Sequence, residues 1–218
     1  EVARLKFLDP ACGSGTFPLG AYQYLLDWHL KWYADADNSP EKWMTGKSPA
    51  IYQSKDGYKL TTSKKKEILL NNIFGVDIDP QAVEVTKLSL LLKVLEGESN
   101  ETIGSQLALF QERVLPDLGR NIKCGNSLIG YDYFEGRMLV EQEERERVNA
   151  FDWKAEFPQV FAQGGFDAVF GNPPYLFIIE LDQAEKDYYF KRYKTTEYRF
   201  DVYGLFTELS VQLLLKDK

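Results

Sequence analysis

The chain has 218 residues, 44% of them hydrophobic and 27% charged, a balance that indicates one soluble globular domain rather than a disordered chain. Its longest apolar runs are far below the roughly 20 residues needed to span a bilayer, and no signal-peptide pattern precedes them, so a cytoplasmic protein is expected. The formal net charge of -7 argues against a broad basic surface that could hold a nucleic-acid backbone unaided.

Residues for metal or histidine chemistry are scarce. Cys12 and Cys124 lie far apart and form no CxxC pair, and His29 is the only histidine. No metal-ligand set can be assembled from them, and histidine-based nucleophilic catalysis is not expected. Cys12 is expected to be a small packing residue and His29 an ordinary helix residue.

The N-terminal segment predicts a strand, a glycine turn and a helix. A buried strand is expected over 4–9, a break over 10–15, and a long aromatic-rich helix over 16–34. Gly13 and Gly15 allow a tight turn and let a ligand approach main-chain N–H groups near a helix N-terminus. The segment lacks the GxGxxG pattern, because Pro18 lies three residues after Gly15, where the pattern has its last glycine. It also lacks the lysine of a P-loop. A nucleoside ligand without a polyphosphate fits it better.

The middle of the chain predicts a second unit of the same kind. Residues 35–66 are polar and turn-rich and indicate a surface insertion with a hairpin about Asp56-Gly57. A helix over 64–71 leads to a buried strand over 73–77, and Asp79-Pro80 opens a helix with Leu88, Leu91, Leu92 and Leu95 on one face. Asp77 ends the strand, where a carboxylate can accept hydrogen bonds from ribose hydroxyls.

The last third completes an α/β pattern. A weaker strand is expected over 121–124, a solvated charged helix over 141–147, a buried strand over 166–170, and a helix from 202 onward. Alternating strands and helices predict a mainly parallel sheet flanked by helices. Ligands bind such sheets beyond the carboxyl ends of the strands, where the turn-like clusters fall, so one shared crevice is expected.

Two aromatic groups leave alternatives open. The segment 188–203 interleaves tyrosines with Lys191, Arg192, Lys194 and Arg199, and either forms part of a nucleic-acid wall or packs on a neighbouring part of the protein. Trp28 and Trp32, one helical turn apart, favour core or interdomain packing over a stacking platform.

The stretch Asn172-Pro173-Pro174-Tyr175 follows a buried strand, and its prolines fix a backbone that offers an amide side chain and prolyl carbonyls as acceptors beside an aromatic ring. The chain resembles the N6-adenine DNA methyltransferases in their first four motifs. These motifs correspond, in order, to residues 9–17, 75–80, 121–128 and this stretch. The closest likeness is to the catalytic part of fused type IIG restriction-modification enzymes, and it extends over nearly the whole chain.

The resemblance implies a Rossmann-like fold dependent on S-adenosylmethionine, incomplete at its C-terminal end. It places Asp77 on the ribose of the cofactor and Ile78 on a face of its adenine. Asn126, at a position where the family often has aspartate, would contact the adenine amino group, and Ser127 is a neighbouring candidate. The methionine end would be held by Asp9, Pro10, Ala11, Cys12, Gly13, Gly15, Thr16 and Phe17. The catalytic residues would be Asn172, Pro173, Pro174 and Tyr175.

The implied reaction methylates N6 of an adenine flipped out of double-stranded DNA, with Tyr175 stacking on the base. Acceptors at Asn172 and Pro173 would draw the amino group toward tetrahedral geometry, with no metal and no covalent enzyme intermediate. Similar motifs occur in methyltransferases acting on protein glutamine or RNA guanine, and a non-catalytic DNA-binding or assembly domain of a phage-defence complex is a further alternative. Residues 123–127 and the insertion favour DNA, while Asn172 and Tyr175 favour an enzyme.

The likeness also predicts what lies beyond the chain. The sequence begins at Glu1 without a methionine and ends inside an expected helix, so we expect part of a larger protein. A target-recognition domain, and a nuclease in some relatives, would belong to the same polypeptide and supply much of the grip on DNA.

Overall fold

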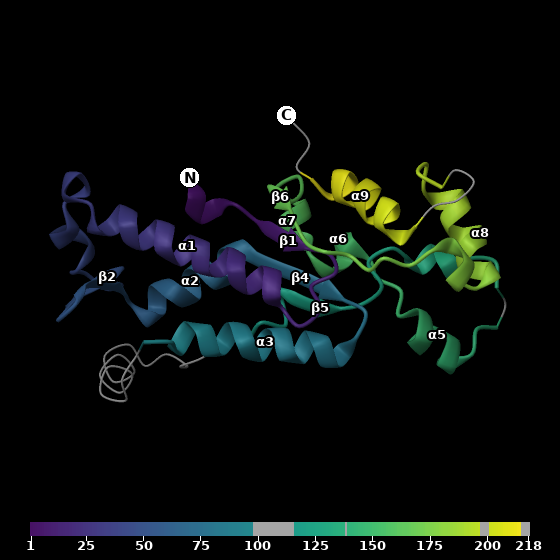
Figure 1. Cartoon of the computed structure of the whole chain (residues 1–218), viewed down its shortest axis with the longest axis horizontal. Helices are drawn as coiled ribbons and strands as arrows, with labels where there is room; N and C mark the ends of the chain where they lie inside the picture. Colours follow the sequence, from purple (N-terminus) through teal and green to yellow (C-terminus); the bar gives the residue numbers. More distant parts are fainter. Residues whose placement is uncertain (98–115, 138, 197–200, 215–218) are drawn as a thin grey trace.

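A four-stranded parallel sheet forms the centre of the molecule, which was studied as a computed structural model that describes residues 1–97, 116–137, 139–196 and 201–214 (Figure 1). The strands lie in the order β5-β4-β1-β6. Their bounds are Phe7–Asp9 for β1, Ile73–Asp77 for β4, Ile122–Cys124 for β5 and Ala168–Val169 for β6. The α/β fold with a mainly parallel sheet is therefore confirmed.

Strand β1 is the point at which the chain order of the sheet reverses. Leu8 pairs with Phe74 of β4 on one side and with Val169 of β6 on the other, while β5 lies beyond β4. Where the strand order reverses in this way, the loops that leave neighbouring strands diverge and open a crevice at their carboxyl ends. The crevice of this sheet is thus expected between the ends of β1 and β6.

Helices cover both faces of the sheet, and successive strand residues point alternately toward one face and the other. Phe7 and Ile73 join a core with the helices of one face, whereas Leu8 and Phe74 join a second core on the other face. The first layer contains α1 (Thr16–Ala34), α2 (Thr62–Asn72) and α3 (Pro80–Leu95). The second contains α5 (Gln142–Val148), α6 (Trp153–Glu156), α7 (Pro158–Phe161), α8 (Gln183–Arg192) and α9 (Val202–Leu213).

Local sequence explains several helix starts. Thr61 accepts a hydrogen bond from the Lys64 N–H at the start of α2, and Asp79 accepts one from Gln81 at the start of α3, where Pro80 takes the first position. Short 3-10 helices over Val2–Arg4, Ala36–Asn38, Pro40–Trp43, Tyr131–Phe134 and Ile178–Glu180 connect the longer elements. Within the described ranges, no helix is long and apolar enough to cross a membrane.

The segment 35–66 contains the predicted hairpin but is not purely a surface insertion. Strands β2 (Ile51–Ser54) and β3 (Gly57–Leu60) form the predicted hairpin, with Lys55 and Asp56 in the turn and Gly57 at the start of β3. However, Ala50, Ile51 and Leu60 are buried and join the core of the first helical layer. The expectation was wrong in this respect, because apolar residues at the hairpin ends extend that core against α1.

The four leucines predicted to share a face of α3 differ in burial: Leu91 is partly buried and packs against the core of the first layer. Leu88 and Leu92 are more than half exposed. The buried side of the helix consists of Val83, Thr86, Leu90 and Val94. A helix with two apolar stripes does not reveal from its sequence which stripe meets the core.

The C-terminal segment departs from the expected helix after Leu213. Leu214 takes an extended conformation and forms a parallel bridge with Phe166, whose N–H donates to the Leu213 carbonyl at 3.0 Å. This pairing beside the sheet explains why α9 stops. The prediction that the chain ends inside a helix was wrong at Leu214, while residues 215–218 lie outside the described residues. Strand β6 is also shorter than the predicted 166–170.

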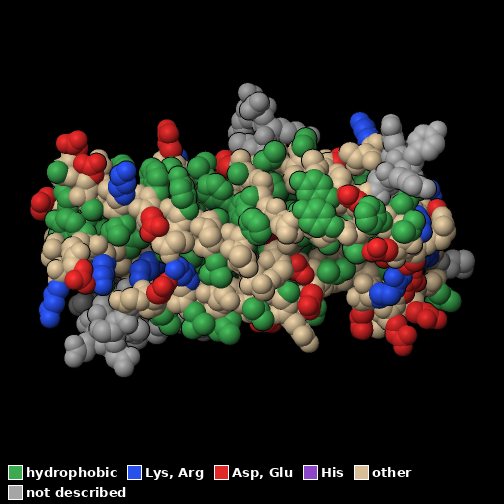
Figure 2. Space-filling view, viewed as in Figure 1, with side chains coloured by type: hydrophobic (Ala, Val, Ile, Leu, Met, Phe, Trp, Pro, Cys, Tyr) green, Lys and Arg blue, Asp and Glu red, His purple; other side chains and the backbone are tan. Residues whose placement is uncertain are grey.

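Charge is unevenly distributed over the surface. The predicted solvated helix is α5, whose glutamates are mostly exposed, and acidic side chains gather at that end of the molecule (Figure 2). Such a surface repels phosphates. The face near α5 that Figure 2 shows is therefore poorly suited to holding a DNA backbone.

Candidate functional site

The loop after β1 is a tight turn that only glycine allows. The Cys12 N–H donates to the Val76 carbonyl at 3.0 Å, and the Thr86 hydroxyl donates to the Gly13 carbonyl at 2.8 Å. Gly15 has a positive φ of 89°, and a Cβ there would lie 2.8 Å from the Thr86 hydroxyl oxygen. The loop is thereby held against both β4 and α3.

Asp77, at the end of β4, is bound to this loop. Its Oδ2 accepts a hydrogen bond from the Gly13 N–H at 2.7 Å, and its Oδ1 accepts one from Asp79 at 3.0 Å. The side chain is partly exposed, and each carboxylate oxygen has a second lone pair. Asp77 can therefore hold the loop and still accept hydrogen bonds from a ligand.

Asp9 is a buried carboxyl group beneath the site. It is 1% exposed, and its Oδ1 accepts a hydrogen bond from the Ala11 N–H at 3.1 Å. Burial raises the pKa of Asp9 to about 7; the Ala11 hydrogen bond opposes this shift and the nearby charge of Asp77 adds to it. A cation placed beside Asp9 would favour its ionised form.

Two exposed apolar side chains flank the glycine loop. Phe17, at the start of α1, and Ile78, after β4, are each 49% exposed. The Ile78 backbone is fixed from the other side, because its carbonyl lies 3.6 Å from the Cys124 sulfur and accepts from the Asn149 amide at 3.3 Å. A flat apolar ligand group could pack against Ile78 without moving its backbone.

The loop after β5 lies next to the glycine loop. The Ser127 hydroxyl donates to the Pro10 carbonyl at 2.5 Å, and both residues are buried. The Asn126 side-chain oxygen accepts from the Leu128 N–H at 3.0 Å, while the Asn126 N–H donates to the Asn149 carbonyl at 2.6 Å. Ser127 thus fastens the two loops together, and Asn126 has a fixed orientation at their edge.

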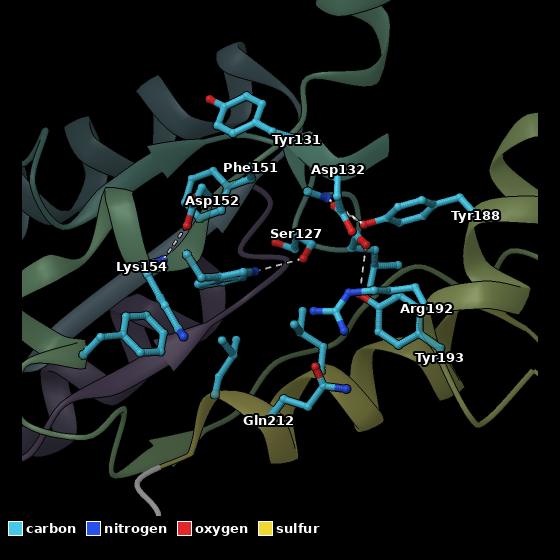
Figure 3. Close-up of a pocket in the computed structure, with 16 residues that line it drawn as sticks. Ser127, Tyr131, Asp132, Phe151, Asp152, Lys154, Tyr188, Arg192, Tyr193 and Gln212 are labelled. Atoms are coloured by element: carbon cyan, nitrogen blue, oxygen red, sulfur yellow. Dashed lines mark hydrogen bonds between the residues drawn. The ribbon is translucent and has the colours of Figure 1, made fainter. Parts of the chain in front are cut away.

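Tyrosines of α8, together with Tyr193 just after that helix, lie against the segment that follows β5 (Figure 3). The Tyr193 hydroxyl donates to the Leu128 carbonyl at 2.9 Å, and that of Tyr188 donates to Asp132 at 2.8 Å. The Asn126 side chain lies close to the buried Tyr189 hydroxyl group. Tyr188 and Tyr193 line a cavity of about 550 Å³ between the loop, α6, α8 and α9.

This arrangement corrects part of the interpretation of 188–203. Tyr189 and Tyr193 are 4% and 5% exposed and belong to the core, so they cannot form a nucleic-acid wall. They pack within the described chain rather than on a separate neighbour. Arg199 lies outside the described residues. Tyr203, at the end of the segment, is exposed.

The stretch 172–175 follows β6 at the same edge of the sheet. Gly171 has a positive φ of 150°, and a Cβ on it would lie 2.4 Å from Asp9 Oδ1. Asn172 and Tyr175 are exposed, and the Tyr175 hydroxyl donates to the Asn172 side-chain oxygen at 3.1 Å. The close approach of Gly171 to Asp9 brings this stretch beside the glycine loop.

The structure therefore brings the loops that carry the predicted residues to one edge of the sheet, although the exposure of these residues differs. Asp9, Pro10, Cys12, Gly15 and Ser127 are buried. The exposed or partly exposed members are Ala11, Gly13, Thr16, Phe17, Asp77, Ile78, Asn126, Asn172, Pro173, Pro174 and Tyr175.

Sequence reasoning missed three residues that lie against residues of the predicted site: Thr86, Asn149 and Tyr189. Thr86 had a detectable signal, since it is the polar member of the stripe 83, 86, 90 and 94 on an otherwise apolar helix face. Asn149 and Tyr189 had no such signal, because their neighbours Ile78 and Asn126 are distant in sequence.

Trp28 and Trp32 are about one-third exposed and pack edge-on against His29 and Tyr33.

Comparison with known proteins gives consistent matches. The model of the Eco57I restriction-modification methylase family matches residues 71–218. The type II restriction enzyme and methyltransferase RM.Eco57I of Escherichia coli is 37% identical over 217 residues, which cover 98% of this chain and 19% of that protein. A putative enzyme of the same kind from Methanocaldococcus jannaschii, RM.MjaORFECS2P, is 34% identical over 60% of this chain and 9% of its own length.

A third relative comes from a differently named group. The adenine-specific methyltransferase PglX of Streptomyces coelicolor is 25% identical over 79% of this chain and 12% of its own length. The chain thus spans a fifth or less of the length of these relatives.

Proposed function

Because the chain belongs to the family of Eco57I restriction-modification methylases, we propose that it forms the part of a DNA methyltransferase that binds S-adenosylmethionine and methylates N6 of adenine. The observation that carries this proposal is the contact between Asp9 and Gly171. It places the Asn172-Pro173-Pro174-Tyr175 stretch beside the glycine loop, at the reversal point of the sheet where ligands of this fold class bind.

The residues present fit S-adenosylmethionine. The ribose hydroxyls would donate to Asp77, the adenine would pack on Ile78, and the loop 10–17 would surround the methionine end, where the cationic amino group favours ionised Asp9. Asn126 would face the amino group of the cofactor's adenine. Ser127 would keep the loops after β1 and β5 together. When bound, the cofactor supplies an electrophilic methyl group on a sulfonium sulfur.

The chemistry of the acceptor follows from Asn172 and Pro173. The exocyclic amino group of adenine is a weak nucleophile, because its lone pair is delocalised into the ring. Hydrogen bonds from its two N–H groups to the Asn172 side-chain oxygen and the Pro173 carbonyl would favour tetrahedral geometry and free that lone pair. The contribution of the chain is positioning and electrostatic stabilisation, and Pro173 and Pro174 keep the acceptors in place.

Tyr175 would hold the base once it has left the duplex. Its ring is 68% exposed on the catalytic loop, and stacking of an extruded base on an aromatic ring is worth about 1–3 kcal/mol. Stacking alone does not distinguish adenine from other bases. The amino-group acceptors provide the selectivity for an amino-bearing substrate.

We further propose that double-stranded DNA is held mainly by parts of the whole protein outside residues 1–218. The acidic balance of the chain and the acidic surface near α5 support this division. The names of two relatives combine a restriction enzyme with a methyltransferase, so a nuclease and a target-recognition region in the same polypeptide are part of the proposal. Such an enzyme would act in the cytoplasm of a bacterium or archaeon, where the chromosome lies.

A choice of acceptors tests the proposed substrate. The full-length protein would be incubated with S-adenosylmethionine labelled in the methyl group and with unmethylated duplex DNA, total RNA and total protein in parallel. We expect label in DNA alone. Label that enters protein glutamine or RNA guanine but never DNA would contradict the proposal.

A further inference from the structure

Tyr203 lies face to face with the catalytic-loop residue Tyr175. Their ring centroids are 5.8 Å apart and their planes differ by 6°. The backbone sets this arrangement, because Phe177 and Asp201 form an antiparallel bridge and the Val202 N–H donates to the Leu176 carbonyl at 2.9 Å. This bridge brings Tyr175 close to Tyr203, which lies in the first turn of α9 (Val202–Leu213), so the two parallel rings meet where the loop passes the start of the helix.

The two tyrosines differ in how firmly they are held. Tyr203 belongs to the first turn of α9, where the Asp201 side chain accepts from the Gly204 N–H at 3.3 Å and the neighbouring Val202 is buried in the core. Tyr175 lies on the exposed loop after Pro174. The ring on the anchored helix therefore supports the ring on the loop.

Tyr175 makes a second contact that concerns the reaction directly. Its hydroxyl donates to the Asn172 side-chain oxygen at 3.1 Å, and this is the oxygen that we assign to the adenine amino group. Without substrate, the acceptor is thus satisfied by Tyr175. An incoming base has to replace this hydrogen bond while the ring that receives the base stays in place.

We propose that Tyr203 is a positioning residue for methyl transfer: it backs one face of Tyr175, so that the other face receives the extruded base as the base amino group displaces the Tyr175 hydroxyl from Asn172. The inference rests on the proposed function. Tyr203 contacts neither cofactor nor target base in this scheme and acts only through Tyr175. Because the ring of Tyr203 is 45% exposed, its removal leaves the core of the second helical layer intact.

Kinetics of single variants of the full-length protein test this role. Methyl transfer from labelled S-adenosylmethionine to unmethylated bacteriophage DNA would be measured for Tyr203→Ala and Tyr203→Phe, with cofactor binding measured by calorimetry. Tyr24→Ala, which removes an equally large and 70% exposed ring from α1, is the matched control. We expect Tyr203→Ala to lower kcat/KM for DNA by roughly two- to tenfold, the range for loss of one aromatic pair.

The other readouts separate positioning from a general structural effect. Cofactor affinity should stay unchanged in Tyr203→Ala, Tyr203→Phe should restore the DNA kinetics, and Tyr24→Ala should match the wild type. Three results would each overturn this inference and leave the proposed function standing. They are wild-type kinetics in Tyr203→Ala, an equal loss of cofactor binding in that variant, and no rescue by Tyr203→Phe. A wild-type protein that methylates no DNA would overturn the proposed function together with it.

Discussion

Asp9 Oδ1 lies 2.4 Å from the point where a Cβ on Gly171 would be placed. The first residue ends β1 and precedes the glycine loop, and the second follows β6 and precedes Asn172. This contact between two adjacent strand ends joins the expected cofactor loop to the expected catalytic loop. No short segment of the sequence contains both residues, so the folded sheet creates the relationship.

Replacing Gly171 by alanine should separate these loops. The new Cβ would collide with Asp9, and φ at this position is 150°, which favours glycine, so we expect a destabilisation of about 1–3 kcal/mol and a loss of methyl transfer of at least about tenfold. Gly20→Ala is the control, because no atom lies within 4 Å of a Cβ there. Urea denaturation and methyl-transfer rates check the prediction, and equal behaviour of the two variants would contradict it.

Asp9 should make stability depend on pH. The pKa of its carboxyl group is raised from 3.8 to about 7 in the folded chain, so folding favours the protonated form. The resulting stabilisation is complete below about pH 3.8 and is lost as pH rises through about 7. In Asp9→Asn this titration is absent.

Denaturation of the wild type and of Asp9→Asn at pH 5, 6, 7 and 8 measures the effect. The stability of the wild type relative to the variant should fall with rising pH by at most about 1.4 kcal/mol per unit, and should level off above pH 7. Other groups titrate in both proteins and cancel in the difference. A difference that stays constant across this range would show that Asp9 has an ordinary pKa.

Thr86→Val should weaken the cofactor loop. The change keeps the shape of a fully buried side chain but removes the hydrogen bond to the Gly13 carbonyl, which costs about 1–3 kcal/mol when a buried acceptor is left unpaired. We expect a comparable loss of affinity for S-adenosylmethionine in calorimetry. In the control Thr207→Val, an exposed hydroxyl that bonds the carbonyl of its own helix is removed, and binding should not change.

The two cysteines should differ in reactivity. Cys12 is buried, and burial raises the pKa of its thiol to about 12, whereas Cys124 is exposed beside the Ile78 carbonyl. Iodoacetamide should therefore modify Cys124 and spare Cys12 in the native protein. Bound S-adenosylmethionine should slow the modification of Cys124, as measured by peptide mass spectrometry. Modification of Cys12 at a similar rate, or no protection of Cys124, would disagree with the proposed site.

The sequence was most informative where local patterns control structure. The helix over 16–34 and the strand over 73–77 have the predicted bounds, since each lies between strong turn signals. The helix expected from 202 onward is α9, which begins at Val202 as predicted. The order of the motifs identified the family. It also predicted that the motif loops lie at one edge of the sheet, because parallel strands bring their carboxyl ends together.

Other features depend on tertiary packing and have no local signature. Leu88 and Leu92 could equally have formed the inner stripe of α3, and only the position of the sheet selects Val83, Thr86 and Leu90 instead. Likewise, nothing near Tyr189 in the sequence shows that it is buried against Asn126. The sequence did not predict the burial of these positions, because their partners come from distant parts of the chain.

The most direct test of the central proposal combines product identification with one substitution. DNA methylated by the full-length protein would be digested to nucleosides, and the products of the wild type and of Asn172→Ala would be compared by mass spectrometry. The account predicts N6-methyladenine as the product of the wild type and a loss of at least about a hundredfold in the variant, typical of removing one group that stabilises a transition state. A different methylated product, or equal formation of N6-methyladenine by the variant, would contradict it.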